Sequence, residues 1–170
     1  MKITKAWSMP NKHTFRIKPI NLLLKKYVHS GQVVVDPFAG GNSEFATISN
    51  DLNPEFNTDY HLDALDFLKV LPDNSADIVL YDPPYSVRQV SESYKNFGIK
   101  VTQEDTQSRW RAKHLDEIAR ILKPRGLLIS FGWNTNGAGK KRGFKQIEIL
   151  IVAHGASHND TLVTVEVLTT

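Results

Sequence analysis

The sequence contains no cysteine among its 170 residues. This absence excludes disulfide bonds, cysteine-ligated zinc, iron–sulfur clusters and thiol nucleophiles. The six histidines show no spacing typical of metal ligands, so we expect no metal site. Any catalysis must therefore use other side chains or a bound cofactor.

Long apolar runs are also absent, and none approaches the roughly 20 residues that span a membrane. The residues Met1 to Trp7 carry positive charge with no apolar stretch behind them, which excludes a secretory signal. With 41% hydrophobic and 23% charged residues, the composition is typical of a globular chain. We expect a cytoplasmic protein formed by a single domain over 1–170, with no separate recognition domain.

Acidic residues are missing from residues 1–30, which contain seven Lys and Arg. Residues 31–85 carry a net charge of -9, residues 86–145 carry +8, and residues 146–170 carry -3. The total of +3 therefore hides two basic blocks around an acidic one. Such blocks are typical of proteins that bind polyanions such as nucleic acid, and equally of solvated helix faces.

Helical and strand-like segments alternate along most of the chain. The apolar spacing predicts helices over 19–31, 63–71 and 104–122, and strands over 32–36, 46–50, 58–61, 76–81, 126–131, 144–153 and 161–168. Strands rich in Val, Ile and Leu between helices indicate an α/β fold with a mostly parallel sheet. The last two strands are joined by a turn and must form an antiparallel hairpin.

Ligands of open parallel sheets bind beyond the carboxyl ends of the strands. One such end carries Asp82-Pro83-Pro84-Tyr85. The two prolines remove two amide donors and hold the backbone extended, which leaves carbonyl groups facing a ligand. A carboxylate, a carbonyl and an aromatic ring then suit a planar amino group, with Asp82 and Pro83 accepting its hydrogens and Tyr85 stacking on its ring.

This motif resembles the catalytic motif of the amino-methylating DNA methyltransferases that use S-adenosylmethionine. The Asp form is typical of members that act on N6 of adenine, and the small phage-type enzymes are the most similar. The resemblance covers nearly the whole chain and implies a Rossmann-like class I methyltransferase fold. It implies direct methyl transfer to DNA in a bacterial or phage-infected cytosol, with no metal and no covalent enzyme intermediate.

The resemblance also implies a set of residues that bind the cofactor. The segment Asp36-Pro37-Phe38-Ala39-Gly40-Gly41-Asn42 is similar to the family's glycine motif, and Lys18-Pro19-Ile20 after Phe15 is similar to its upstream helix start. Asp51 matches the acid that binds ribose, and Asp63-Ala64 matches the pair that reads the cofactor adenine. Without the resemblance, Asp51 equally suits a turn cap and Asp63 a helix N-cap.

Two features depart from the family pattern. Asn42 stands where the family has a glycine, and only fourteen residues separate Asp36 from Asp51. A parallel crossover with a helix needs a dozen or more residues, so we expect no helix after the glycine loop. The cofactor pocket is then open on that side.

Three further features concern substrate binding. The glycine-bounded loop with Lys140, Lys141 and Arg142 is expected at the same sheet edge as the catalytic motif, where it contacts phosphate or is simply solvated. The segment 86–103 is interpreted as a mobile lid that contains Arg88. With no recognition domain, short or relaxed specificity is expected, or specificity from a homodimer or a partner subunit.

Several alternatives stay open on the sequence alone. The acceptor amine can belong to adenine in RNA, to N4 of cytosine or to a protein glutamine. A catalytically silent, nucleic-acid-binding subunit is the alternative from a different functional class. The biological role, whether protection of phage DNA, restriction–modification or regulation, cannot be read from the sequence.

Overall fold

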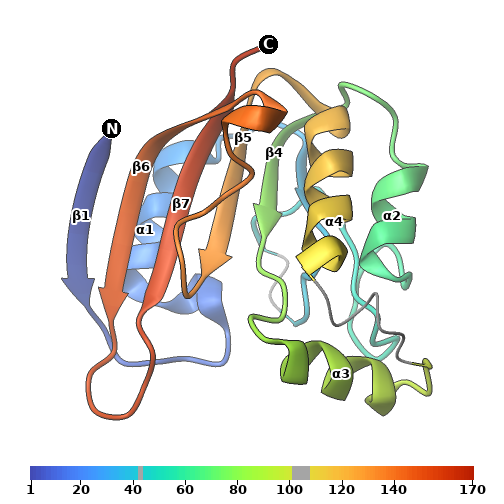
Figure 1. Cartoon of the computed structure of the whole chain (residues 1–170), viewed down its shortest axis with the longest axis horizontal. Coiled ribbons are helices and arrows are strands. Elements are labelled where there is room, and N and C mark those ends of the chain that lie inside the picture. The colour runs from blue at the N-terminus through green and yellow to red at the C-terminus, as the bar shows by residue number, and fades with distance from the viewer. Residues whose placement is uncertain (42–43, 101–107) are drawn as a thin grey trace.

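The computed structural model describes residues 1–41, 44–100 and 108–170 and shows an α/β fold (Figure 1). The elements follow in the order β1 (Lys2–Trp7), η1 (Thr14–Arg16), α1 (Lys18–Tyr27), β2 (Val34–Asp36), β3 (Ile48–Ser49), α2 (Ala64–Val70), β4 (Ala76–Tyr81), α3 (Val87–Asn96), α4 (Ser108–Ile121), β5 (Leu122–Gly132), η2 (Lys140–Arg142), β6 (Phe144–Ala153) and β7 (Thr161–Leu168).

The strands form one seven-stranded sheet in the order β1-β6-β7-β5-β4-β2-β3. β7 runs antiparallel to both of its neighbours, β5 and β6, and the other pairs are parallel. The mostly parallel sheet and its antiparallel β6–β7 hairpin confirm the predicted fold class. The predicted strands 76–81, 144–153 and 161–168 match β4, β6 and β7 at both ends.

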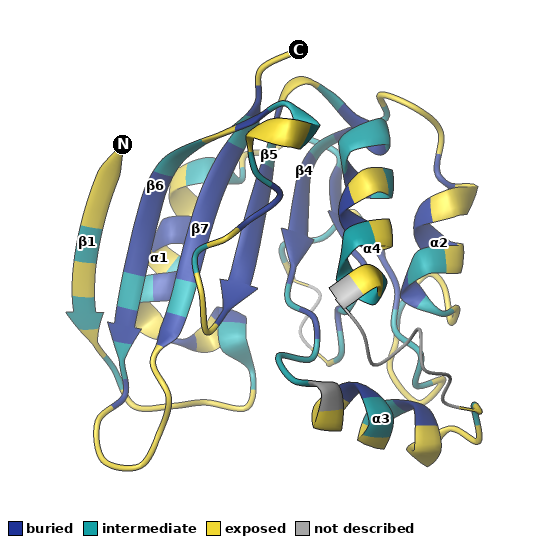
Figure 2. Cartoon of the chain, in the orientation of Figure 1, coloured by how far each residue is buried: buried dark blue, intermediate teal, exposed yellow. Residues whose placement is uncertain are grey.

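Helices cover both faces of the sheet, because neighbouring residues of a buried strand point to opposite sides. Ile78 and Leu80 of β4 pack with α1 on one face, whereas Val79 and Tyr81 pack with α2 and α4 on the other. The side chains of these four β4 residues are fully buried (Figure 2). β4 therefore lies at the centre of the core and delivers the residues that follow it to a fixed position.

Parts of the fold differ from the sequence predictions or refine them, and one expectation is confirmed. β1 was not expected, and the segment interpreted as a lid contains the ten-residue helix α3, while residues 101–103 of that segment lie outside the described residues. The predicted strand at 58–61 is reduced to a single bridge between Asn50 and Tyr60. The described residues between β2 and β3 form turns, which confirms that no helix follows the glycine loop there.

Among the described residues, no helix is long and apolar enough to cross a membrane.

We expect Leu68→Ala in α2 to lower the free energy of unfolding by about 2–5 kcal/mol, because it empties a fully buried site. Val70→Ala on the same helix is the matched control, since Val70 is 59% exposed and its loss should change stability by less than about 0.5 kcal/mol. Urea denaturation of both variants measures the difference. Equal losses would contradict the assignment of the α2 core face.

Candidate active site

The carboxyl ends of β2, β4 and β5 meet at one edge of the sheet, the lower end in Figure 1. We call this edge the catalytic edge. It is completed by the segment between β1 and α1, because β1 and β6 also end there. The acids Asp36 and Asp82 stand at the ends of β2 and β4, so the fold brings these two predicted site residues together.

The carboxylate of Asp82 is the centre of this edge. The hydroxyl of Tyr85 donates a hydrogen bond to Asp82 Oδ1, and Thr14 lines both cavities that Asp82 lines. Burial raises the pKa of Asp82 above its usual range, although the hydrogen bond from Tyr85 acts in the opposite direction. Asp82 is therefore a half-buried carboxyl group with an increased affinity for a proton.

The two prolines line an open cavity of about 370 Å³ beside Asp82. Pro83 is buried, and the backbone N–H of Tyr85 donates to Oε1 of Gln89 at 2.6 Å. Gln89 and Ser93 of α3 line the same cavity, so α3 forms one of its walls. The carboxylate and both prolines therefore lie in the wall of one cavity that is open to solvent.

Trp133 is an aromatic neighbour of the motif, in the segment 132–134 that the strand-end argument makes a candidate for the site. It follows β5, is 44% exposed, and places its ring centroid 5.6 Å from that of Tyr85 at an interplanar angle of 70°. Such an edge-to-face contact is favourable for two aromatic rings. The position of Trp133 after a strand end was the available signal.

Asp36 is fully buried behind the glycine loop. Its Oδ1 accepts a hydrogen bond from the Phe38 N–H at 3.0 Å, and its Oδ2 has no partner among the described residues. Burial raises the pKa of Asp36 well above its usual range, and the nearby charges of Asp82 and Asp51 act in the same direction. A cationic group at this edge would relieve that cost.

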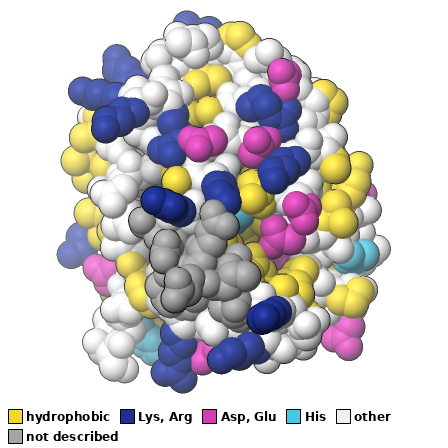
Figure 3. Space-filling model, turned by 45° about the vertical axis from the view of Figure 1, so that its right-hand side comes forward, with side chains coloured by type: hydrophobic (Ala, Val, Ile, Leu, Met, Phe, Trp, Pro, Cys, Tyr) yellow, Lys and Arg dark blue, Asp and Glu magenta, His cyan; other side chains and the backbone are white. Residues whose placement is uncertain are grey.

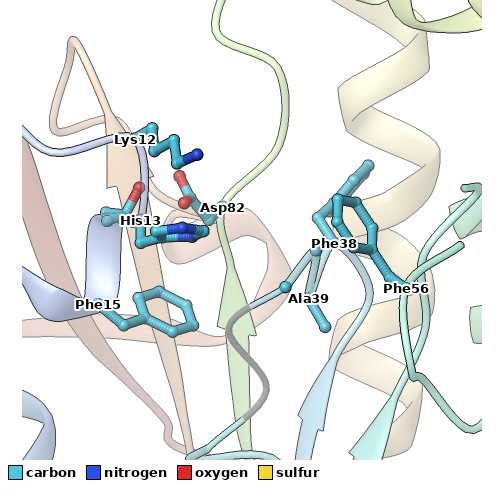
Figure 4. A pocket seen from close by; sticks show the side chains of 10 residues that line it. Lys12, His13, Phe15, Phe38, Ala39, Phe56 and Asp82 are labelled. Atoms are coloured by element: carbon cyan, nitrogen blue, oxygen red, sulfur yellow. The ribbon is translucent and has the colours of Figure 1, made fainter.

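The glycine loop borders a second cavity, of about 300 Å³ (Figure 4). Phe15, His13 and Asp82 lie on one side of it, and Phe38 and Phe56 lie on the other. Gly40 has a φ of +53°, a backbone conformation that glycine adopts without strain. Phe56 and His13 form walls that the sequence did not predict, and Asn42 lies outside the described residues.

Asp51 connects the glycine loop to the segment after β3. Its Oδ2 accepts from the Gly40 N–H at 2.8 Å and its Oδ1 from the Asn53 N–H at 2.8 Å. Asp51 therefore caps a turn, as one of its two interpretations predicts. It also lines the cavity beside Asp82 and a smaller cavity described below. The carboxylate is consequently held in place at the cavity wall.

A third cavity, of about 60 Å³, adjoins Asp51 and includes Pro37, Ala64 and Asp63 in its lining. Asp63 Oδ1 caps α2 through the Leu65 N–H at 3.0 Å, and its Oδ2 accepts a hydrogen bond from the Tyr94 hydroxyl. Asp63 therefore caps α2 and also lines this cavity. Tyr94, which belongs to the segment interpreted as a lid, and Trp110 also line this cavity, and the sequence did not identify Trp110 as a site residue.

The predicted cationic residues are not brought together. Arg88 lies on exposed α3 and pairs with Glu92 at 2.7 Å, and Lys18 lies outside the linings of these three cavities. The expected position of Lys140, Lys141 and Arg142 at the catalytic edge is wrong. Because β6 runs parallel to β5, the chain returns to the opposite end of the sheet before β6 begins.

Among the described residues, no group of three or more His, Asp or Glu side chains could hold a metal ion.

We expect Asp36→Asn to raise the free energy of unfolding at neutral pH. A raised pKa in the folded state means that Asp36 contributes stability below its unfolded pKa and loses that contribution as the pH rises through the folded value. The advantage of Asn should therefore grow from about pH 4 upward, as thermal melts at several pH values would show. Exposed Asp160→Asn is the control, and a pH-independent difference for Asp36→Asn would contradict the assignment.

Two proteins of known sequence resemble the chain, although no protein-family profile matches it. It is 33% identical over 103 residues to the type II methyltransferase M.BamHI of Bacillus amyloliquefaciens, covering 55% of this chain and 23% of that protein. It is 29% identical over 94 residues to the putative methylase YubD of Escherichia coli (strain K12), covering 52% of this chain and 39% of YubD. The chain thus spans well under half the length of each relative.

Solved structures share the fold over most of the chain. A SAM-dependent methyltransferase from Archaeoglobus fulgidus superposes with a TM-score of 0.58 at 12% identity, covering 88% of this chain and 93% of that one. The 1,6-didemethyltoxoflavin-N1-methyltransferase of Burkholderia thailandensis, solved with S-adenosylhomocysteine, has a TM-score of 0.58 at 13% identity, covering 90% of this chain and 78% of that one. The chain therefore has the Rossmann-like fold of S-adenosylmethionine-dependent methyltransferases.

Proposed function

We propose that this chain is an S-adenosylmethionine-dependent methyltransferase that acts on N6 of adenine in DNA. The observation that carries the proposal is the position of Asp82-Pro83-Pro84-Tyr85, at the catalytic edge of a methyltransferase fold and beside adjoining cavities. The partial likeness to M.BamHI and the S-adenosylhomocysteine in a structure of the same fold support the cofactor and the reaction class.

The residues at the edge fit this cofactor. The unpartnered Oδ2 of Asp36 suits a cationic group near the glycine loop, and Asp51 presents a fixed carboxylate where ribose hydroxyls can donate. Phe15, Phe38 and Gly40 would enclose the amino-acid part, and Pro37, Asp63 and Ala64 the adenine part. When bound, S-adenosylmethionine supplies an electrophilic methyl group on a positively charged sulfur.

The catalytic motif orients the acceptor amine. Asp82 and the carbonyl of Pro83 accept its two hydrogens, and the ring of Tyr85 stacks on the base. In the transfer, the amino nitrogen would gain a bond to the methyl carbon while the carbon–sulfur bond of the cofactor breaks and its electron pair returns to sulfur. The nitrogen would then lose a proton, which Asp82 is suited to take because its pKa is raised. In duplex DNA the base must first leave the stack, which costs a few kcal/mol.

The acceptor is identified by incubating the protein with labelled S-adenosylmethionine and either DNA or RNA, followed by mass analysis of the nucleosides. We expect N6-methyldeoxyadenosine from DNA. Label in cytosine or only in RNA would keep the chemistry and overturn the acceptor, and label in neither would overturn the proposed function.

We expect Asp82→Ala to lower methyl transfer by at least about 100-fold, because it removes a fixed acceptor that acts on the reacting amine. Cofactor affinity, measured by calorimetry, should change little, so that the loss lies in kcat. Transfer at the wild-type rate would contradict the role of Asp82.

Trp133→Ala should raise the KM for nucleic acid and lower kcat, because the ring of Tyr85 loses its edge-to-face neighbour. Trp133→Phe should restore most of the activity. Trp7→Ala is the matched control, since Trp7 is also exposed, at 64%, but lies on the edge strand β1. Equal effects of the two alanine variants would contradict a specific role for Trp133.

A further inference from the structure

The segment between β1 and α1 carries cations to the catalytic edge. Lys12, Arg16 and Lys18 are all exposed there, and the first 30 residues contain no acid. Lys12 lines the cavity beside the glycine loop, Arg16 ends η1 and Lys18 begins α1. Three basic residues of the N-terminal sequence therefore lie at the catalytic edge.

These three cations form no ion pair with any residue that the structure describes. Other basic residues do: Arg142 pairs with Asp116 at 2.6 Å, and Lys123 pairs with Asp77 at 2.8 Å. A cation without an acidic partner keeps its full charge available for an anion. By this criterion the cations around η1 are better placed to bind phosphate than Arg142 is, and they differ from Lys140 and Lys141, unpaired among the described residues, by their position at the catalytic edge.

Arg16 lies close to the carboxylate that would orient the substrate. Thr14, two residues earlier, lines both cavities that Asp82 lines. The Cα atoms of Thr14 and Arg16 are two residues apart in the chain and therefore at most about 7 Å from each other. Those of Thr14 and Lys18 are four residues apart and therefore at most about 14 Å from each other. A duplex carries a phosphate every ~1.7 Å along its axis, so several phosphates around a target nucleotide fall within the reach of these side chains.

Other exposed cations at this edge belong to a different segment, with Lys95 in the last turn of α3 and Lys100 after it. On the side of α2 and α4, cations and anions are interspersed (Figure 3). The basic turn η2, with Lys140 and Lys141, lies at the opposite end of the sheet. One acid does touch α1, since Glu44 accepts a hydrogen bond from the Asn21 side chain at 3.3 Å.

We propose that Arg16 and Lys18 bind the phosphates that flank the target nucleotide and hold the nucleic-acid strand across the catalytic edge. The inference rests on the proposed function and names the surface that the substrate contacts. These residues give affinity and orientation without reading base identity, because phosphate contacts carry no sequence information. The N-terminal end of α1 supports the same contact, since a helix dipole favours anions there.

The test compares Arg16→Ala/Lys18→Ala with the matched pair Lys140→Ala/Lys141→Ala at the opposite end. Binding of a fluorescein-labelled, mixed-sequence DNA duplex is measured by anisotropy between about 50 and 200 mM salt. We expect the first pair to bind more weakly and to flatten the slope of log K against log salt by roughly 0.9 for each phosphate that is no longer neutralised. The second pair should behave as wild type, and calorimetry should show unchanged cofactor affinity for that pair and for the single variant Arg16→Ala.

Two further variants sharpen the result. Arg16→Lys should retain the salt dependence, because a phosphate contact needs the charge, and Glu44→Gln should strengthen binding by removing a nearby anion. A flattened salt slope in Lys140→Ala/Lys141→Ala but not in Arg16→Ala/Lys18→Ala would overturn the inference while leaving the proposed function intact. A wild-type protein that methylates no nucleic acid would instead overturn the proposed function.

Discussion

The hydrogen bond from Tyr85 to the carboxylate of Asp82 is the interaction on which the rest of the site depends. It joins the end of the buried strand β4 to the loop that follows it, and Thr14 of the N-terminal segment lines both cavities that Asp82 lines. Burial raises the pKa of this carboxyl group, and the hydrogen bond from Tyr85 opposes that shift. The carboxylate and the basic N-terminal segment therefore border the same cavities.

The short connection after β2 shapes the cofactor side of the edge. Without a helix there, the glycine loop is held by Asp51 through the Gly40 N–H, and its outer wall is formed by side chains from distant segments. A Cβ on Gly41 would lie 3.6 Å from the Phe56 ring and 3.8 Å from the His13 ring. The small chain thus encloses the cavity with aromatic side chains where a helix is missing.

The predictable parts of this protein are those where local sequence and tertiary environment agree. Five of the six β4 residues are apolar and buried, so its ends and the motif behind it could be located from the sequence. β1 and α3 could not, because β1 is a mostly exposed edge strand with two lysines and no apolar alternation, and α3 is mostly polar, with Val90 and Tyr94 its buried residues among those described. The basic turn η2 was misplaced because no local signal shows that β7, rather than β6, pairs with β5.

The proposed chemistry requires that S-adenosylmethionine bind between the glycine loop and Asp82. The most direct test is calorimetric titration of the protein with S-adenosylhomocysteine, the product that shares every proposed contact except the methyl group. We predict a one-to-one complex that Asp51→Ala weakens, because that variant removes the fixed carboxylate at the cavity wall. Absence of binding by the folded wild-type protein would contradict the proposed cofactor site.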